Sequence, residues 1–281
     1  MILTINHETV YRYDTAAAHS TQYLRLTPRD GDGQHVLEWK LELPVPAFAC
    51  TDSFGNVLHV LTLDMPHDCI RIRATGIVET EAGERMCFDG DARPYLRSTA
   101  LTTMSPAMET FAESFREASM SLAAVERLAH AIHGCMAFDT ATTHAATTAA
   151  EAFGVASGVC QDYTHIFIAC CRHLGVPARY VSGYVHSSGH RLEDHQASHA
   201  WAEAWSGDRW WSFDVLNRCR AGATHLKLAV GMDYMDACPV RGVRRGGGTE
   251  HLSAAVRVMQ GQPGQSPEAL QQALEQQQQQ Q

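Results

Sequence analysis

The sequence predicts an α+β fold, with an N-terminal β-sandwich followed by a core in which a buried helix packs on an antiparallel sheet. Apolar and polar residues alternate in short runs through residues 1–85, as in strands that bury one face. Apolar residues recur at the helical spacing of three and four in segments 121–136 and 160–174. Alternation returns after residue 178, so strands follow the helices.

The first 85 residues are interpreted as a separate β module. Apolar and charged residues alternate from Leu37 to Leu43, which predicts a strand with one buried face. The run from 57 to 63 follows a Gly55-Asn56 turn and is apolar on both faces, as a central strand would be. Short strands with turns between them favour an antiparallel sandwich.

Residues 86–260 are predicted to form the core with a connector at its start. Helices are expected from about residue 106 to 136, with Ser121 as an N-cap. Two late strands are expected on either side of a basic, glycine-rich loop at 241–248. Residues 261–281 are rich in glutamine, a composition typical of a disordered or weakly helical tail.

A short stretch, 158–163, leads from a flexible loop into the buried helix. Gly175 and Pro177 are a stop signal for this helix. Cys160 is therefore expected in its first turn, where unpaired backbone N–H groups and the positive end of the helix dipole favour an anion. A thiol in such a place tends to ionise to the thiolate, which is the nucleophilic form.

Two neighbouring strands after the helix carry the other polar candidates. The first alternates strictly and places His199 and Trp201 on one face. A turn at Gly207-Asp208 leads to the second strand, which carries Asp214. Adjacent antiparallel strands can bring two such side chains within hydrogen-bonding distance.

Cys160, His199 and Asp214 together predict nucleophilic catalysis on a carboxamide. The thiolate would attack the carbonyl carbon, and His199 would act as base and acid. Asp214 would orient the imidazole and stabilise its positive charge. Backbone N–H groups at the helix start, including that of Cys160, would bind the oxyanion. Each of these residues alone is weak evidence, because cysteine and histidine more often have structural roles.

Three further residues are candidates for lining the site. Gln161 could face the substrate or solvent. Asp162 suits the helix dipole and could simply cap the helix. Trp201 shares the face of His199 and could shield it from water, although a tryptophan in a strand is more often part of the core.

Composition excludes several functional classes. The net charge of −9 and the pI near 5.9 argue against a nucleic-acid surface. We find no signal peptide and no stretch long enough to span a membrane, so we expect no membrane partner and a cytoplasmic location. The nine cysteines include no C-x-x-C pair, which predicts reduced thiols without a zinc ribbon. No cofactor or metal is predicted, and the oligomeric state is left open.

The motifs Gly-Val-Cys-Gln-Asp-Tyr, Ser-His-Ala-Trp-Ala-Glu and Trp-Trp-Ser-Phe-Asp resemble those of the bacterial branch of the transglutaminase-like superfamily, whose members are often described as cysteine proteases. The resemblance covers most of the chain, including the β-rich N-terminal region. It implies a papain-like α+β core and a Cys-His-Asp triad at Cys160, His199 and Asp214. One departure is visible, because the family usually has Pro-Thr-Asn after the aspartate and this chain has Val215-Leu216-Asn217.

The same triad can serve two reactions on a peptide or protein substrate. The thioester formed on the cysteine could pass to water, as in a peptidase or amidase, or to an amine, as in a transglutaminase. We favour hydrolysis, since water is always present and the sequence reveals no amine site.

Two other classes are kept as alternatives. A metal-dependent hydrolase could use a histidine group formed by His186, His190, His195 and His199, but no H-E-x-x-H motif occurs. A non-catalytic interaction protein could use the N-terminal module as its binding part, in which case the triad would be superfluous.

Overall fold

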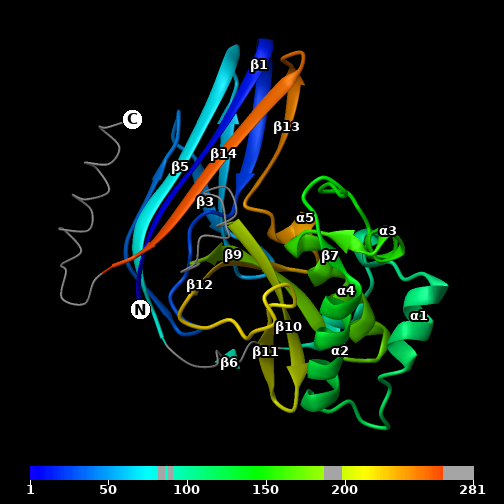
Figure 1. Cartoon of the computed structure of the whole chain (residues 1–281). Helices are drawn as coiled ribbons and strands as arrows, with labels where there is room; N and C mark the ends of the chain where they lie inside the picture. Colours follow the sequence, from blue (N-terminus) through cyan, green and yellow to red (C-terminus); the bar gives the residue numbers. More distant parts are fainter. Residues whose placement is uncertain (82–85, 88–90, 187–197, 262–281) are drawn as a thin grey trace.

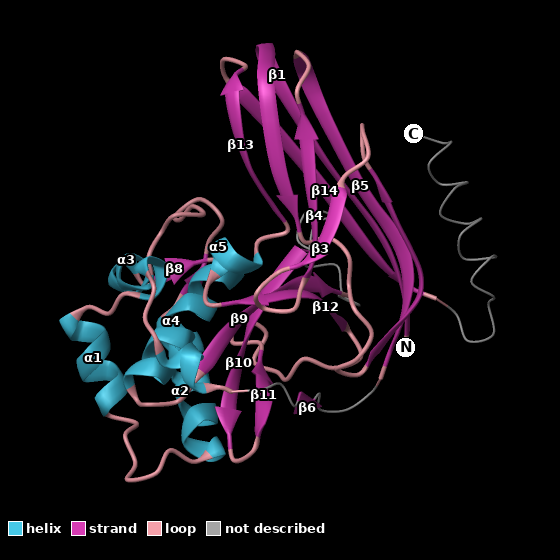
Figure 2. Ribbon diagram, turned by 180° about the vertical axis from the view of Figure 1, so that it is seen from behind, coloured by secondary structure: helices cyan, strands magenta, loops and turns pink. Residues whose placement is uncertain are grey.

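The structure is a computed structural model that describes residues 1–81, 86–87, 91–186 and 198–261 (Figure 1). A long β region lies beside a compact region in which helices cover one face of a second sheet (Figures 1 and 2). The predicted glutamine-rich tail lies outside the described residues, apart from Gly261. Among the described residues, no helix combines the length and the apolar composition that crossing a bilayer requires.

The N-terminal region is built around one long strand, β1 (Ile2–Leu24). Its first half pairs with β5 (His67–Thr80) and its second half with β4 (Val57–Leu63). β1 runs to the far end of the region and turns back there (Figures 1 and 2). Because strands that bend at a corner belong to two layers, the sheet folds over a shared apolar core. The predicted sandwich is confirmed, and β2 (Gln34–Glu42) and β3 (Phe48–Thr51) extend it.

The last two strands of the described chain also belong to this region. β13 (Val240–Gly246) and β14 (Glu250–Gln260) pair with the second and first halves of β1. The sequence pattern predicts residues 240–260 in the core and 241–248 in a loop, and the pairing with β1 corrects both predictions. An alternating pattern identifies a strand but not its partner, and the partner here is an edge of β1 that lies far away in the sequence.

The second sheet has the strand order β12-β9-β10-β11-β6, and neighbouring strands are antiparallel. Helix α4 (Cys160–His173) packs on β9 and β10 and is contacted on its outer side by α1, α2 and α3. All its residues from 162 to 172 are buried, so it forms the centre of the core. The bounds of the remaining elements are β6 Met86–Cys87, η1 Arg93–Leu96, η2 Ala100–Thr102, α1 Pro106–Glu113, α2 Leu122–Cys135, β7 Ala137–Phe138, α3 Ala149–Val155, β8 Ser157–Gly158, β9 Ala178–Val185, β10 Ser198–Ser206, β11 Arg209–Phe213, β12 His225–Gly231 and α5 Tyr234–Ala237.

The two regions are joined along β12. The Gln34 side chain donates to the Lys227 carbonyl and accepts from the Lys227 N–H, both at 2.9 Å. Asn56 makes the same pair of contacts with Val230, both at 2.8 Å. Leu226 and Leu228 of β12 belong to the apolar core of the N-terminal region. The β module therefore shares an apolar core with the sheet that carries the candidate site, and two of its side chains bind the backbone of that sheet.

Candidate active site

The start of α4 fixes the position of Cys160, which is the first residue of the helix. The Asp162 carboxylate reaches back and accepts hydrogen bonds from the Val159 N–H at 2.8 Å and the Thr143 hydroxyl at 2.6 Å. A Cβ at position 158 would lie 2.4 Å from the Asp162 Oδ2 atom, so only glycine fits there. Asp162 thus acts as a buried cap that shapes the turn before the cysteine, and burial raises its pKa.

His199 and Asp214 lie together at one end of the second sheet. His199 is the second residue of β10, and Asp214 follows the end of β11. The His199 Nε2 atom lies 2.7 Å from the Asp214 Oδ2 atom, and both side chains are buried. The hairpin between β10 and β11 has the register that the alternating sequence predicts, with Ala202 opposite Phe213.

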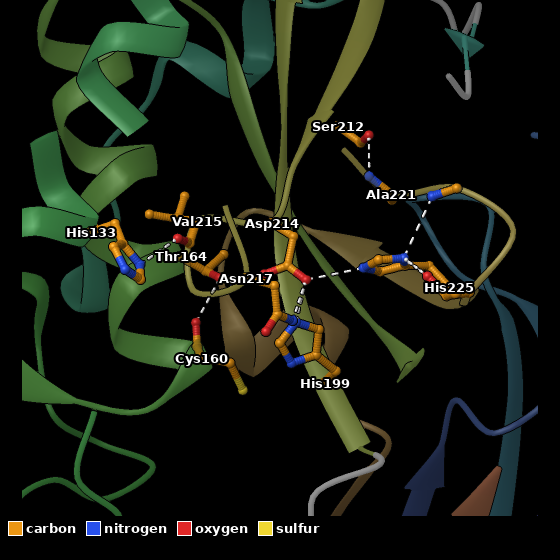
Figure 3. A network of polar contacts seen from close by, with 12 residues as sticks. His133, Cys160, Thr164, His199, Ser212, Asp214, Val215, Asn217, Ala221 and His225 are labelled. Atoms are coloured by element: carbon orange, nitrogen blue, oxygen red, sulfur yellow. Dashed lines mark hydrogen bonds and ion pairs between the residues drawn. The ribbon is translucent and has the colours of Figure 1, made fainter. Parts of the chain in front are cut away.

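The sulfur of Cys160 points toward the His199 ring (Figure 3). The thiol is near enough to this imidazole to contribute, after Asp214, to raising its pKa. Because Nε2 faces Asp214, Nδ1 is the ring nitrogen left to face the thiol. The structure therefore brings together the thiol, the imidazole and the carboxylate that the sequence singled out.

The electrostatics around His199 favour a charged imidazole. Burial disfavours the imidazolium, but the carboxylate of Asp214 outweighs burial and raises the pKa of His199 to about 10. Burial likewise opposes the carboxylate, but His199 and His225 hold the pKa of Asp214 well below its usual range. An ion pair of this kind supplies the positive charge that a thiolate needs beside it.

Two residues that sequence reasoning did not place in the site also contact Asp214. Asn217 donates from its backbone N–H to Oδ1 at 3.0 Å and from its side-chain amide to Oδ2 at 2.7 Å. His225, the first residue of β12, places its Nε2 atom 3.0 Å from the same Oδ2. An asparagine three residues after an aspartate is a recognisable turn signal. Nothing in the sequence distinguishes His225 from the other histidines.

The two remaining candidates, Gln161 and Trp201, have structural contacts beside the site. The Gln161 side chain donates to the Ala145 carbonyl at 3.1 Å and so holds the preceding loop. Trp201 is 1% exposed and packs against the rings of His199 and His225, with centroids 6.3 and 5.3 Å away. Trp201 therefore lies behind the imidazoles as part of the core.

The histidine group of the metal alternative is only partly described. His190 and His195 lie outside the described residues, and His186 contacts the Val258 carbonyl through Nδ1 at 3.1 Å. A different group, His199, Asp214 and His225, has side-chain atoms within 4.8 Å of one another. Because these atoms lie at hydrogen-bonding distances, we describe the group as a hydrogen-bond network.

A cavity of about 220 Å³ lies between α2 and the segment that carries Asp214. Phe213 and Val215 form part of its wall, and the ion pair of Arg220 with Glu126, at 2.6 Å, lies at its side. Asp214 also lines this cavity, whereas Cys160 and His199 do not. The cavity therefore borders the carboxylate of the predicted triad but not its thiol or its imidazole.

Comparisons with known proteins agree with this architecture. Residues 3–79 match the bacterial transglutaminase-like N-terminal region, and residues 109–215 match the transglutaminase-like superfamily. Residues 109–215 therefore belong to the transglutaminase-like superfamily, and residues 3–79 have the N-terminal region that accompanies this domain in bacterial proteins.

Two mycobacterial relatives and one solved structure cover most of the chain. An uncharacterized protein of Mycobacterium leprae is 28% identical over 276 residues, which span 91% of this chain and 98% of the relative. An uncharacterized protein of Mycobacterium tuberculosis is 27% identical over 270 residues, 85% of this chain and 86% of the relative. A crystal structure named "Putative Cysteine Protease", from Cytophaga hutchinsonii, has a TM-score of 0.77 at 21% identity and covers 95% of this chain and 93% of its own. At that identity the likeness supports the fold alone.

Proposed function

We propose that this protein is a cysteine-dependent enzyme that cleaves amide bonds of a peptide or protein substrate through a thioester on Cys160. The observation that carries the proposal is the position of His199, whose ring lies between the Cys160 sulfur and the Asp214 carboxylate (Figure 3). A positively charged imidazole beside a thiol at a helix start is the arrangement that activates sulfur as a nucleophile.

In the first half of the reaction, the Cys160 thiolate attacks the carbonyl carbon of the amide. The oxygen takes the electron pair of the C=O bond, and the first N–H groups of α4, which lack partners within a helix, stabilise the charge. When the C–N bond breaks, the leaving nitrogen takes the Nδ1 proton of His199. The products are an amine and a thioester.

In the second half, His199 is neutral and acts as a base. Its Nδ1 atom takes a proton from water as the water oxygen attacks the thioester carbonyl. The C–S bond then breaks, the carboxylic acid leaves, and the thiolate–imidazolium pair is restored. Asp214 keeps Nε2 protonated throughout, which fixes the orientation of the ring. A primary amine in place of water would give transamidation by the same steps.

Selective alkylation of the native protein tests the proposal. Iodoacetamide at neutral pH should label Cys160 faster than Cys69, an exposed cysteine in the β region, and peptide mapping by mass spectrometry reads both sites in one sample. His199→Ala should remove the difference, and Cys69→Ala should leave the Cys160 rate unchanged. Equal rates at Cys160 and Cys69 in the wild-type protein would favour the non-catalytic alternative.

Casein and a fluorescent primary amine separate the two reactions. We expect new peptide ends with the wild-type protein and none with Cys160→Ala. Incorporation of the amine faster than cleavage would overturn our preference for hydrolysis. Activity that survives Cys160→Ala and disappears with a chelator would instead support the metal-dependent alternative.

A further inference from the structure

The Asp214 carboxylate contacts two buried histidines through one oxygen atom. The Nε2 atoms of His199 and His225 lie 2.7 and 3.0 Å from Oδ2 (Figure 3). Both rings are buried, with 7% and 2% of the residue exposed. The proposed reaction uses His199 and gives His225 no role. Burying a second imidazole against a buried carboxylate costs free energy of desolvation, so a role for His225 is worth seeking.

The contacts of His225 define which of its nitrogens carries a proton. The backbone N–H of Gly222 points at Nδ1, 3.4 Å away, so Nδ1 accepts. The Thr224 hydroxyl lies 3.1 Å from the same atom and can also donate to it. With Nδ1 as the acceptor, the proton of a neutral ring is on Nε2 and is donated to Asp214. His225 is thus arranged as a donor to the carboxylate.

The surroundings hold the His225 ring in this orientation. The ring of Trp201 meets it edge-on, with centroids 5.3 Å apart. Trp201 reaches it across β9 at Gly183, where an added Cβ would lie 2.6 Å from the indole. The backbone of β12 is fixed two residues later by the paired contacts between Gln34 and Lys227. The ring contact with Trp201 and the side-chain contacts of Gln34 to the β12 backbone therefore leave the imidazole little freedom.

We propose that His225 is a positioning residue of the active site, which donates a hydrogen bond to Asp214 so that the carboxylate stays aimed at His199. This inference rests on the proposed function of Cys160, His199 and Asp214. Oδ2 needs a donor on its far side, because a buried carboxylate with fewer partners turns toward other donors or loses its charge. Asn217, the other donor, is itself exposed and so provides a less protected contact.

The test compares three substitutions at one position. Glutamine carries its amide nitrogen about as far from the backbone as Nε2 of histidine, so His225→Gln can keep the donor. His225→Asn is too short to reach Oδ2, and His225→Leu fills the space without a donor. His251→Leu is the matched control, because His251 contacts the Asp14 carboxylate at 2.9 Å on the exposed surface of the β region.

Two measurements on the full chain report on the site. The first is the rate at which iodoacetamide alkylates Cys160. The second is the downfield NMR signal of the His199 Nε2 proton, which senses its hydrogen bond to Asp214 directly. We expect about a tenfold slower alkylation and an upfield shift or loss of the His199 signal in His225→Leu and His225→Asn. His225→Gln and His251→Leu should resemble the wild-type protein. If the leucine variant fails to fold, the contrast between asparagine and glutamine decides.

Wild-type alkylation and an unshifted His199 signal in a folded His225→Asn or His225→Leu variant would overturn the inference. Equal losses in the asparagine and glutamine variants would also overturn it, since they would mean that the ring shape matters and the donor does not. If wild-type Cys160 reacts no faster than Cys69, the proposed function fails. The NMR measurement would then still decide whether His225 holds Asp214 toward His199.

Discussion

Replacing Asp214 by asparagine removes the negative charge that His199 and His225 contact, and it keeps the size of the side chain. In the wild-type protein the carboxylate contacts His199, His225 and Asn217 through hydrogen bonds of 2.7 to 3.0 Å. The variant loses the negative charge, and its amide nitrogen can donate a hydrogen bond but cannot accept one from an imidazole. His199 remains buried in the variant, and burial without a carboxylate partner favours the neutral ring over the imidazolium.

The size of the effect follows from the balance at His199. Asp214 raises the pKa of His199 to about 10 against the effect of burial, which lowers it. Without the carboxylate, burial should bring that pKa below the ordinary value of 6.5. At pH 7.5 the imidazolium fraction then falls from nearly all to below about a tenth. The lost orientation of the ring adds about 2 kcal/mol, the usual strength of a hydrogen bond to a charged group. Together the two factors predict that turnover falls by about three-hundredfold.

The assay measures Cys160 alkylation and casein cleavage between pH 5 and pH 10 for the wild-type protein, Asp214→Asn and a matched control. Asp208→Asn is that control, because Asp208 lies in the turn between the same two strands with its side chain 72% exposed. Wild-type and control curves should coincide. In Asp214→Asn, alkylation of Cys160 at pH 7.5 should be at least about tenfold slower. Rates that follow the control across the whole pH range would refute the role given to the ion pair.

Three further predictions concern stability. Gly158→Ala should lower the unfolding free energy by about 1–3 kcal/mol, because the added Cβ would meet the Asp162 carboxylate at 2.4 Å; a thermal unfolding midpoint equal to that of wild type would contradict this. Gln34→Ala should cost about 2 kcal/mol in urea unfolding, because it leaves an N–H and a carbonyl of β12 without their partners; an unchanged midpoint would mean that water replaces the amide. The extra unfolding free energy of wild type over Asp214→Asn should be largest between about pH 4 and 6.5. It should decrease as the pH rises toward the pKa of His199, about 10, and decrease again in acid as Asp214 takes up a proton. A difference that does not change with pH would contradict the ion pair.

The features that the sequence predicted correctly depend on local rules. The position of Cys160 follows from the start and stop signals of one helix. The closeness of His199 and Asp214 follows from one hairpin, in which alternation sets the face and a short turn sets the register. The position of Asp162 in the first turn suits a cap, and its carboxylate accepts a hydrogen bond from the Val159 N–H as a cap does. Each of these inferences needed fewer than about twenty residues of neighbouring chain.

The features that the sequence did not reveal depend on the order of strands in a sheet. His225 reaches Asp214 because β12 pairs with β9 in the antiparallel sense. This pairing places the start of β12 at the same end of the sheet as the start of β10. No local pattern contains that information, since β12 would show the same alternation beside any other strand. The pairing of β13 and β14 with β1 is hidden for the same reason, although strand-forming residues are visible in both.

The contact between the two regions suggests why the β-rich region accompanies this core. Strand β12 lies at the edge of its sheet, and an edge strand can slip in register when one side is unpaired. A slip by one residue would turn His225 to the opposite face and away from Asp214. Gln34 and Asn56 each bind one N–H and one carbonyl of β12, at positions three residues apart, which fits a single register. The N-terminal region thus holds the strand in the one alignment that brings His225 to the carboxylate, so its removal should disturb the site.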